Sequence, residues 1–254
     1  MISDLCRTVL AAIRSLAAYV GVSVYVLAVA PPGMAIALWF RRPEVLYWLG
    51  RGGVRLGLAA AGINYRIEGR EHLQEGRATV YCVNHGSNLE PPIVYMALAS
   101  IHPRLKILYK SELRQVIPVL RSAFDVVGFV PIDRHNRENS KMSIESAAKS
   151  LKAGNSFLVF PEGTRSRSGE LLPFKKGGFV MAIRAGAAVV PVSIQGTRAA
   201  MRKGSPIIRP VTVSVRIGLP FDGVGVSLDQ RDALIAKTRA AMQALLAQGP
   251  IMRQ

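Results

Sequence analysis

The chain has 254 residues, of which 50% are hydrophobic and 19% are charged, so it is not an intrinsically disordered polymer. This length suffices for one catalytic domain with a short appendage. The formal net charge of +17 attracts polyanions, and its basic residues are scattered through apolar sequence, so we expect lipid headgroups or phosphorylated substrates as partners and no nucleic acid.

The N-terminal region contains an apolar run, residues 15–40, with no charged residue between Arg14 and Arg41. The run exceeds the roughly 20 residues that a helix needs to cross a bilayer. Its Pro31-Pro32 pair leaves two geometries open: one helix kinked near its end, or two shorter helices that dip into one leaflet. We therefore expect residues 1–58 to form a membrane-associating helical segment and residues 59–254 to form the catalytic domain.

Basic residues flank this run unequally, and no small-residue cleavage site of a signal peptide follows it. Arg41, Arg42, Arg51 and Arg55 follow the run, whereas only two arginines precede it. The positive-inside bias then predicts that the catalytic domain lies on the cytoplasmic face of the inner membrane.

From residue 63 onward, short apolar runs alternate with amphipathic stretches. We expect strands at 63–67, 79–83, 105–109, 126–132, 156–160, 188–194 and 211–217. We expect helices at 91–99, at 140–152 before Gly154, and after a capping box formed by Ser227 and Gln230. This alternation predicts an α/β fold with a mixed, largely parallel sheet flanked by helices.

Polar side chains follow the strand predicted at 79–83, in the segment Asn-His-Gly-Ser-Asn-Leu-Glu. His85 and Glu90 are five positions apart across a turn, so the carboxylate can accept the Nδ1 proton. Nε2 is then free to take a proton from a substrate hydroxyl, with the acid stabilising the imidazolium that forms. The alternative is that His85 only caps the next helix. Cys82 is interpreted as a strand residue and not as a nucleophile.

Cationic and glycine-containing turns follow three other predicted strands, at the edge where open α/β sheets bind ligands. In residues 160–166, backbone N–H groups with Thr164 and Arg165 can converge on an anion. Arg134 and Lys110 each follow another strand. Taken singly, each of these cations fits a solvated charge better than a ligand contact.

The blocks NHGSNLE, GFVPIDR, FPEGTRS and VVPVSIQG occur in this order within residues 63–220. Together they resemble the four blocks of the glycerolipid acyltransferase family, which includes 1-acylglycerol-3-phosphate acyltransferases. The resemblance implies that His85 is the general base and that Glu90 stands where the family has Asp. It also implies that the acceptor phosphate is bound by Arg134, Glu162, Gly163, Thr164 and Arg165, with Lys110 as a helper.

The resemblance further implies transfer of an acyl group from acyl-CoA or acyl carrier protein to 1-acylglycerol-3-phosphate, which gives phosphatidic acid. The implied partners are this lysophospholipid, the thioester donor and membrane lipids, without a metal or redox cofactor. Glu90 is one methylene longer than Asp and reaches His85 only if the turn or its rotamer adjusts. Acylation of glycerol-3-phosphate or of another lysolipid such as lyso-ornithine lipid, or an inactive lipid-binding homologue, therefore remain alternatives.

The other candidate side chains have no companion residues in the sequence. His72, His102 and His135 lie among polar residues, and we expect all three at the surface. Lys175 and Lys176 precede a Gly-Gly pair and are interpreted either as facing a headgroup or as part of a solvated turn.

Overall fold

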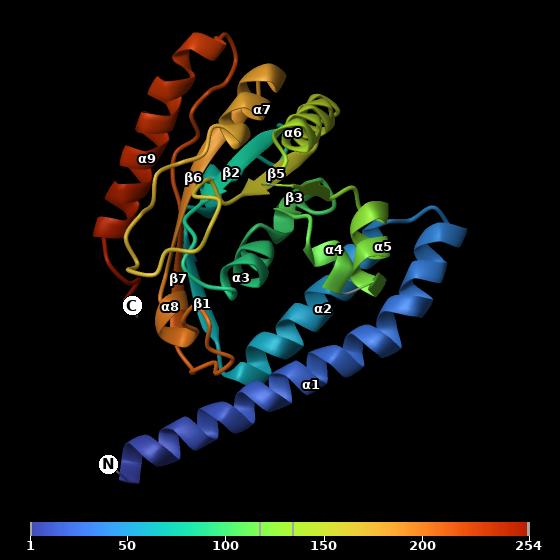
Figure 1. The fold of residues 1–254 in the computed structure, drawn as a ribbon, viewed down its shortest axis with the longest axis vertical. Helices are drawn as coiled ribbons and strands as arrows, with labels where there is room; N and C mark the ends of the chain where they lie inside the picture. Colours follow the sequence, from blue (N-terminus) through green and yellow to red (C-terminus); the bar gives the residue numbers. More distant parts are fainter. Residues whose placement is uncertain (1, 117, 134, 253–254) are drawn as a thin grey trace.

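The computed structural model describes residues 2–116, 118–133 and 135–252. Within them, helices cover both faces of one seven-stranded sheet, and a long helical hairpin at the N-terminus packs along one side (Figure 1). The sheet order is β1-β7-β6-β2-β5-β3-β4. The strands are β1 (Asn64–Glu68), β2 (Thr79–Val83), β3 (Leu105–Lys110), β4 (Val130–Ile132), β5 (Ser156–Val159), β6 (Ala188–Gln195) and β7 (Thr212–Ile217).

All neighbouring strands pair in parallel except β6 and β7, which are antiparallel, so the predicted mixed, largely parallel sheet is confirmed. Because β2, β5, β3 and β4 are consecutive and parallel, their carboxyl ends lie side by side along one edge. Their side chains alternate between two cores: Tyr81 and Val83 face one, and Val80 and Cys82 face the other.

The helices divide between the two faces of the sheet (Figure 1). The first core includes residues of α2 and α3, and the second includes residues of α6, α7 and α9. The helices are α1 (Ile2–Trp39), α2 (Glu44–Ala61), α3 (Glu90–Ala97), α4 (Leu113–Val116), α5 (Pro118–Val126), α6 (Arg137–Lys152), α7 (Gly177–Ala185), α8 (Thr197–Ala200) and α9 (Arg231–Ala247).

The predicted apolar run forms part of one continuous helix, α1, and not two short ones. Pro31 and Pro32 lie inside α1, where their missing N–H groups favour a bend, and the ribbon changes direction toward its C-terminal end (Figure 1). Only 11% of the residues in its most apolar stretch are buried. Helix α1 packs on α2, and it leaves many large apolar side chains exposed. The predicted boundary at residue 58 falls inside α2 and stays a prediction.

Six of the seven predicted strands match the observed ones to within one residue at each end. The exception is the strand predicted at 126–132, which was wrong in its first half. Residues 118–126 form α5, and Gly128, with φ +75°, makes the turn into a strand of only three residues. The capping box of Ser227 and Gln230 is present, on a short 3-10 turn that leads into α9.

Candidate active site

The site begins where β2 ends, at Asn84. Its side-chain amide donates through Nδ2 to the Ile194 carbonyl at 3.0 Å, and its Oδ1 accepts the Ile194 N–H at 2.7 Å. The amide therefore continues the pairing of β2 with β6 for one more position after the backbone has turned away. This fixes the start of the turn that carries His85.

His85 is hydrogen-bonded to Glu90, as the sequence predicted, with 2.7 Å between Nδ1 and Oε2. The carboxylate is buried, and it also accepts the Gly86 N–H at 2.9 and 2.8 Å and the Thr197 hydroxyl at 2.7 Å. Because these donors surround the carboxylate, His85 donates through Nδ1, and Nε2 carries the lone pair. Among the described residues Nε2 has no hydrogen-bond partner, so it is available to a substrate.

The longer acidic side chain fits because the turn folds over it. Glu90 is the first residue of α3, and its carboxylate points back beneath Gly86, where an added Cβ would lie 3.5 Å from Oε1. The residue before α3, Leu89, makes no capping hydrogen bond through its side chain, and the His85 ring bonds to the Glu90 carboxylate and not to a backbone N–H of α3. The alternative in which His85 serves as that cap is therefore wrong.

The segment after β5 holds His85 from the neighbouring strand. The Phe160 ring stacks on the imidazole with 4.2 Å between centroids, and the Ser166 N–H donates to the His85 carbonyl at 2.7 Å. Glu162 accepts the His85 N–H at 2.7 Å through Oε1 and the Leu172 N–H at 2.9 Å through Oε2. The backbone of His85 is thus fixed on both sides, which limits where its ring can point.

Glu162, which the family resemblance assigned to the acceptor phosphate, is buried, with only 2% of its surface exposed. Burial raises the pKa of its carboxyl group, and the N–H groups of Leu172 and His85 oppose this shift. Both of its oxygens are already occupied by backbone donors. Its hydrogen bonds therefore connect two turns, and the carboxylate does not face open solvent.

The remaining predicted phosphate ligands are placed unequally. Gly163, with φ +69°, and exposed Thr164 continue the turn, and the Arg165 carbonyl accepts Lys203 Nζ at 3.0 Å. These three predicted residues follow Phe160 in the sequence, in the same segment that contacts His85.

Lys110 and Arg134, the other two cations predicted to bind the phosphate, belong to other segments of the chain. Lys110 ends β3, and its Nζ forms an ion pair with Glu112 at 2.8 Å. That pair holds the pKa of the Glu112 carboxyl well below its usual range. Arg134 lies outside the described residues.

Sequence reasoning missed Thr197, whose hydroxyl donates to Glu90. It lies 107 residues further along the chain, at the start of the short helix α8, and no local pattern marks it. The Ser87 hydroxyl donates to the Met201 carbonyl at 2.8 Å and so fastens the same helix to the His85 turn. Only the packing of α8 against the turn reveals either contact.

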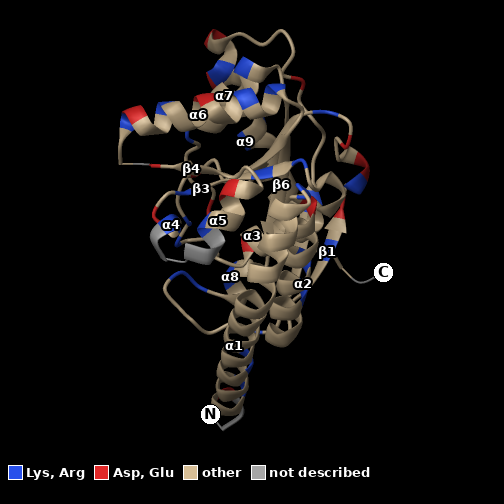
Figure 2. Cartoon of the chain, turned by 90° about the vertical axis from the view of Figure 1, so that its right-hand side faces the viewer, with Lys and Arg blue, Asp and Glu red and all other residues tan. Residues whose placement is uncertain are grey.

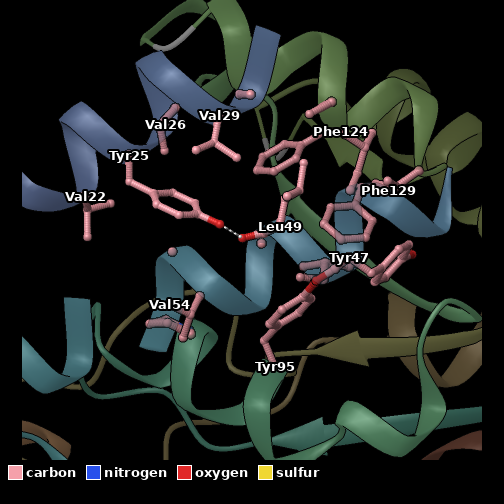
Figure 3. Close-up of a pocket in the computed structure, with 18 of the residues that line it drawn as sticks. Val22, Tyr25, Val26, Val29, Tyr47, Leu49, Val54, Tyr95, Phe124 and Phe129 are labelled. Carbon is pink, nitrogen blue, oxygen red and sulfur yellow. Dashed lines mark hydrogen bonds between the residues drawn. The ribbon is translucent and has the colours of Figure 1, made fainter. Parts of the chain in front are cut away.

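A cavity of about 310 Å³, here called the apolar pocket, lies between the α1–α2 hairpin and the α/β domain (Figure 3). Tyr25 of α1 donates to the Leu49 carbonyl at 2.9 Å across it. Pro91 and Pro92, which follow Glu90 directly, form part of its wall. The other lining residues are Val22, Tyr25, Val26, Val29, Ala30, Leu46, Tyr47, Leu49, Gly50, Gly53, Val54, Tyr95, Ile107, Ala123, Phe124, Val127 and Phe129.

A second cavity of about 710 Å³, here called the basic cavity, lies at the carboxyl ends of β3, β4 and β5 between α6 and α7. Phe160, which stacks on His85, lines it together with Pro161 and Gly163. Phe160 thus contacts both the basic cavity and the imidazole, although His85 itself does not line the cavity. Its basic side chains are Arg137, Lys141, Lys175, Lys176, Arg184 and Arg231.

Comparison with known proteins gives a consistent result. A family model described as Acyltransferase matches residues 64–195. The chain is 34% identical over 174 residues to a 1-acyl-sn-glycerol-3-phosphate acyltransferase from Limnanthes douglasii, a match that covers 67% of this chain and 59% of the relative. It is 37% identical over 159 residues to a chloroplastic 1-acyl-sn-glycerol-3-phosphate acyltransferase from Arabidopsis thaliana, covering 62% and 43%. The chain thus spans less than two thirds of either relative.

The fold is also similar to a solved structure. The crystal structure of the 1-acyl-sn-glycerophosphate acyltransferase from Thermotoga maritima superposes with a TM-score of 0.80. The two sequences are 23% identical, and the match covers 99% of each chain. At that identity the likeness concerns the fold, and it includes the N-terminal helices as well as the sheet.

Proposed function

Because this chain belongs to the acyltransferase family, we propose that it transfers a fatty acyl group from a thioester to the free hydroxyl of 1-acylglycerol-3-phosphate, which gives phosphatidic acid. One observation carries the proposal: the buried Glu90 carboxylate holds His85 Nδ1 at 2.7 Å and leaves Nε2 open at the carboxyl edge of the sheet. The two plant relatives, which carry the name of this activity, support the choice of acceptor.

In the proposed reaction, His85 acts as a general base and then as a general acid. Nε2 takes the proton of the acceptor hydroxyl while the hydroxyl oxygen attacks the thioester carbonyl carbon. When the tetrahedral intermediate collapses, the carbon–sulfur bond breaks and the leaving thiolate takes that proton back from His85. Glu90 keeps the imidazole in the reactive tautomer and stabilises its charged form.

The contacts of Glu90 support this positioning role. Besides His85, the carboxylate accepts the Gly86 N–H and the Thr197 hydroxyl, so it cannot rotate away without losing charge-assisted hydrogen bonds. We assign Glu162 a positioning role as well, through the His85 N–H that it accepts. A carboxylate in contact with an acceptor phosphate would be repelled by it, which is a further reason for this assignment.

The acceptor phosphate is proposed to bind at the turn of Gly163, Thr164 and Arg165, together with Lys110, which ends β3 at the same edge, and with Arg134, which follows β4 in the sequence. Thr164 is exposed there, and an arginine can bind phosphate through two parallel hydrogen bonds. Lys110 would then exchange its ion pair with Glu112 for the phosphate. This arrangement holds the hydroxyl of the acceptor near Nε2, and such positioning supplies a large part of enzymatic rate enhancement.

The α1–α2 hairpin is proposed to lie at a membrane, where acceptor and product both reside. Leu16, Val24, Leu27 and Trp39 are among the large apolar side chains that α1 exposes, at 64%, 61%, 68% and 85%. The apolar pocket beneath this hairpin suits an acyl chain, because its walls are almost wholly hydrocarbon. The excess of arginine after α1 favours the cytoplasmic side.

A panel of acceptors tests this proposal. Purified protein in detergent is incubated with palmitoyl-CoA or palmitoyl acyl carrier protein and with 1-acylglycerol-3-phosphate, glycerol-3-phosphate or lyso-ornithine lipid, and the products are identified by mass spectrometry. We expect phosphatidic acid from the first acceptor at the highest rate. Turnover of only one of the other acceptors would replace the assigned substrate, and binding of lipid without turnover would identify an inactive homologue.

A further inference from the structure

The basic cavity gathers more positive charge than the proposed reaction uses. None of its cations belongs to the turn assigned to the acceptor phosphate, and its volume of about 710 Å³ lies in the range of small-molecule sites. Figure 2 shows α6 and α7 carrying many blue and red segments, whereas α1 and α2 are mostly tan. The cavity is therefore a polar, charged environment on the side of the sheet away from the hairpin.

Acidic neighbours neutralise only part of this charge. Arg184 pairs with Glu145 at 3.4 Å, and Arg231 pairs with Asp232 at 3.0 Å. Weaker pairs join Lys141 to Glu138 at 3.7 Å and Lys176 to Asp232 at 3.9 Å.

Two of the lining cations stand apart from these pairs. Within the described ranges, Arg137 and Lys175 have no acidic partner. They lie on different walls, since Arg137 begins α6 and Lys175 precedes α7. Two separated cations facing one cavity suit a ligand with more than one anionic group.

The backbone at the start of α7 adds donors to the same wall. Gly177 and Gly178 line the cavity, and among the described residues no side chain caps this nine-residue helix. Added Cβ atoms there would lie 3.0 Å from Ile144 and 3.1 Å from Val159, so glycine lets the helix end approach α6 and β5 closely. The helix N-terminus, with its partial positive charge, then supplements Arg137 and Lys175.

We propose that the basic cavity binds the pyrophosphate and the ribose 3′-phosphate of a coenzyme A thioester. This inference rests on the proposed function, and it names the donor. Because Phe160 lines the cavity and stacks on His85, a donor held there extends its pantetheine arm past Phe160 toward Nε2. A carrier protein would bring only one phosphodiester, and it would leave most of these lining cations without an anion.

The experiment measures CoA binding to the full chain in detergent by isothermal titration calorimetry. The variant Arg137→Gln/Lys175→Gln removes both unpaired cations, and we expect roughly tenfold weaker CoA binding, since each charged hydrogen bond contributes appreciably. The matched control is Lys149→Gln, an exposed lysine of α6 that does not line the cavity, and its affinity should equal that of the unaltered protein. The unaltered protein should also bind 3′-dephospho-CoA several-fold more weakly than CoA.

Steady-state kinetics provide the second readout. The double variant should raise KM for palmitoyl-CoA about tenfold and change KM for 1-acylglycerol-3-phosphate much less, although Lys175 lies close to Gly163. Equal CoA affinity in the double variant and the unaltered protein overturns the assignment. A change that is confined to KM for the acceptor, or to KM for palmitoyl acyl carrier protein, also overturns it. CoA binding is measured without acceptor, so this inference can fail while acyl transfer is observed, and His85→Ala should still bind CoA.

Discussion

The apolar pocket and the basic cavity are opposite environments, and each is lined by a residue that adjoins the His85–Glu90 pair. The apolar pocket lies under the hairpin and reaches Pro91 and Pro92, directly after Glu90. The basic cavity lies on the α6–α7 side and reaches Phe160, which stacks on His85. A hydrocarbon chain and a polyanion prefer opposite surroundings, so a reaction that joins them needs its catalytic group at the boundary. His85 stacks on Phe160, which lines the basic cavity, and bonds to Glu90, which precedes the prolines that line the apolar pocket, so it lies between lining residues of the two.

The two regions also differ in how the chain builds them. The apolar pocket depends on helix packing between distant segments, because α1 and α2 must lie against α3 and α5 before it exists. The basic cavity is lined by exposed polar side chains along α6 and α7, by the ends of strands and by the turn after β5. Substitutions in the first region therefore alter shape, whereas substitutions in the second alter charge. The predictions below use this difference.

Removing the group at the boundary should have the largest effect. We expect His85→Ala to lower kcat by at least about 10³-fold, because general base catalysis and proton return to the thiolate are both lost. The measurement is acyl transfer from palmitoyl-CoA to 1-acylglycerol-3-phosphate. Circular dichroism should show an unchanged fold, since Gly86 and Thr197 still donate to the Glu90 carboxylate and Glu162 still accepts the backbone N–H at position 85. Near-normal turnover in this variant would refute the role of His85.

Disturbing the orientation of the imidazole should have the next largest effect. We expect Glu90→Gln to lower kcat roughly 10²-fold, because an amide nitrogen facing Nδ1 favours the wrong tautomer. Thr197→Val keeps the carboxylate and removes only one of its donors, so kcat should fall only a few-fold. The two variants are compared in the same assay. Equal losses in both would mean that Glu90 serves the fold and not the tautomer of His85.

The sequence predicted well those contacts of the site that join residues close together in the chain. His85 and Glu90 are five residues apart, and the end of β2 could be read from the apolar run before it, so their hydrogen bond was predictable. The order of motifs along the chain also predicted that the segment of Glu162 would lie near His85. Parallel strands that end in polar residues bring such segments to one edge.

The parts that were not predictable depend on distant contacts. No local signal places Thr197 against Glu90, and both cavities require segments that only folding brings together. His102 was expected at the surface, yet it packs between Tyr47 and Tyr95, with ring centroids 5.0 and 4.2 Å apart. Its polar neighbours in sequence suggested exposure, whereas its neighbours in space are aromatic.

Changing the shape of the apolar pocket should alter which acyl chain is accepted. Val26 lines the pocket, and we expect Val26→Phe to lower kcat/KM for the longest acyl chains about tenfold relative to shorter ones, because the ring fills part of a small cavity. Val24→Phe is the matched control, because Val24 is 61% exposed on the same helix and does not line the pocket. The measurement is competition among acyl donors of different length, repeated for lysolipids of different length. A uniform loss over all lengths would mean that the pocket does not hold the chain.

The smallest predicted effect is a pH dependence of stability on the apolar side. Burial, aided by the nearby Arg51 charge, lowers the pKa of His102 from 6.5 to about 4. Since the folded state binds this proton less readily than the unfolded state, stability is lost as pH falls from about 6.5 toward 4. We expect a loss of about 1 kcal/mol, reduced from the full shift because part of the ring meets solvent.

Thermal unfolding near pH 7 and pH 5 measures this loss, and His102→Phe is the variant that isolates it. Both ring nitrogens of His102 are buried without a hydrogen-bond partner in the described chain, so a phenyl ring removes no bond and preserves the packing against Tyr47 and Tyr95. We therefore expect the variant to lose less stability than the unaltered protein on acidification. If both proteins lose the same stability on acidification, the aromatic cluster tolerates a charged imidazole. The apolar and the basic side of the sheet would then differ less than their geometry implies.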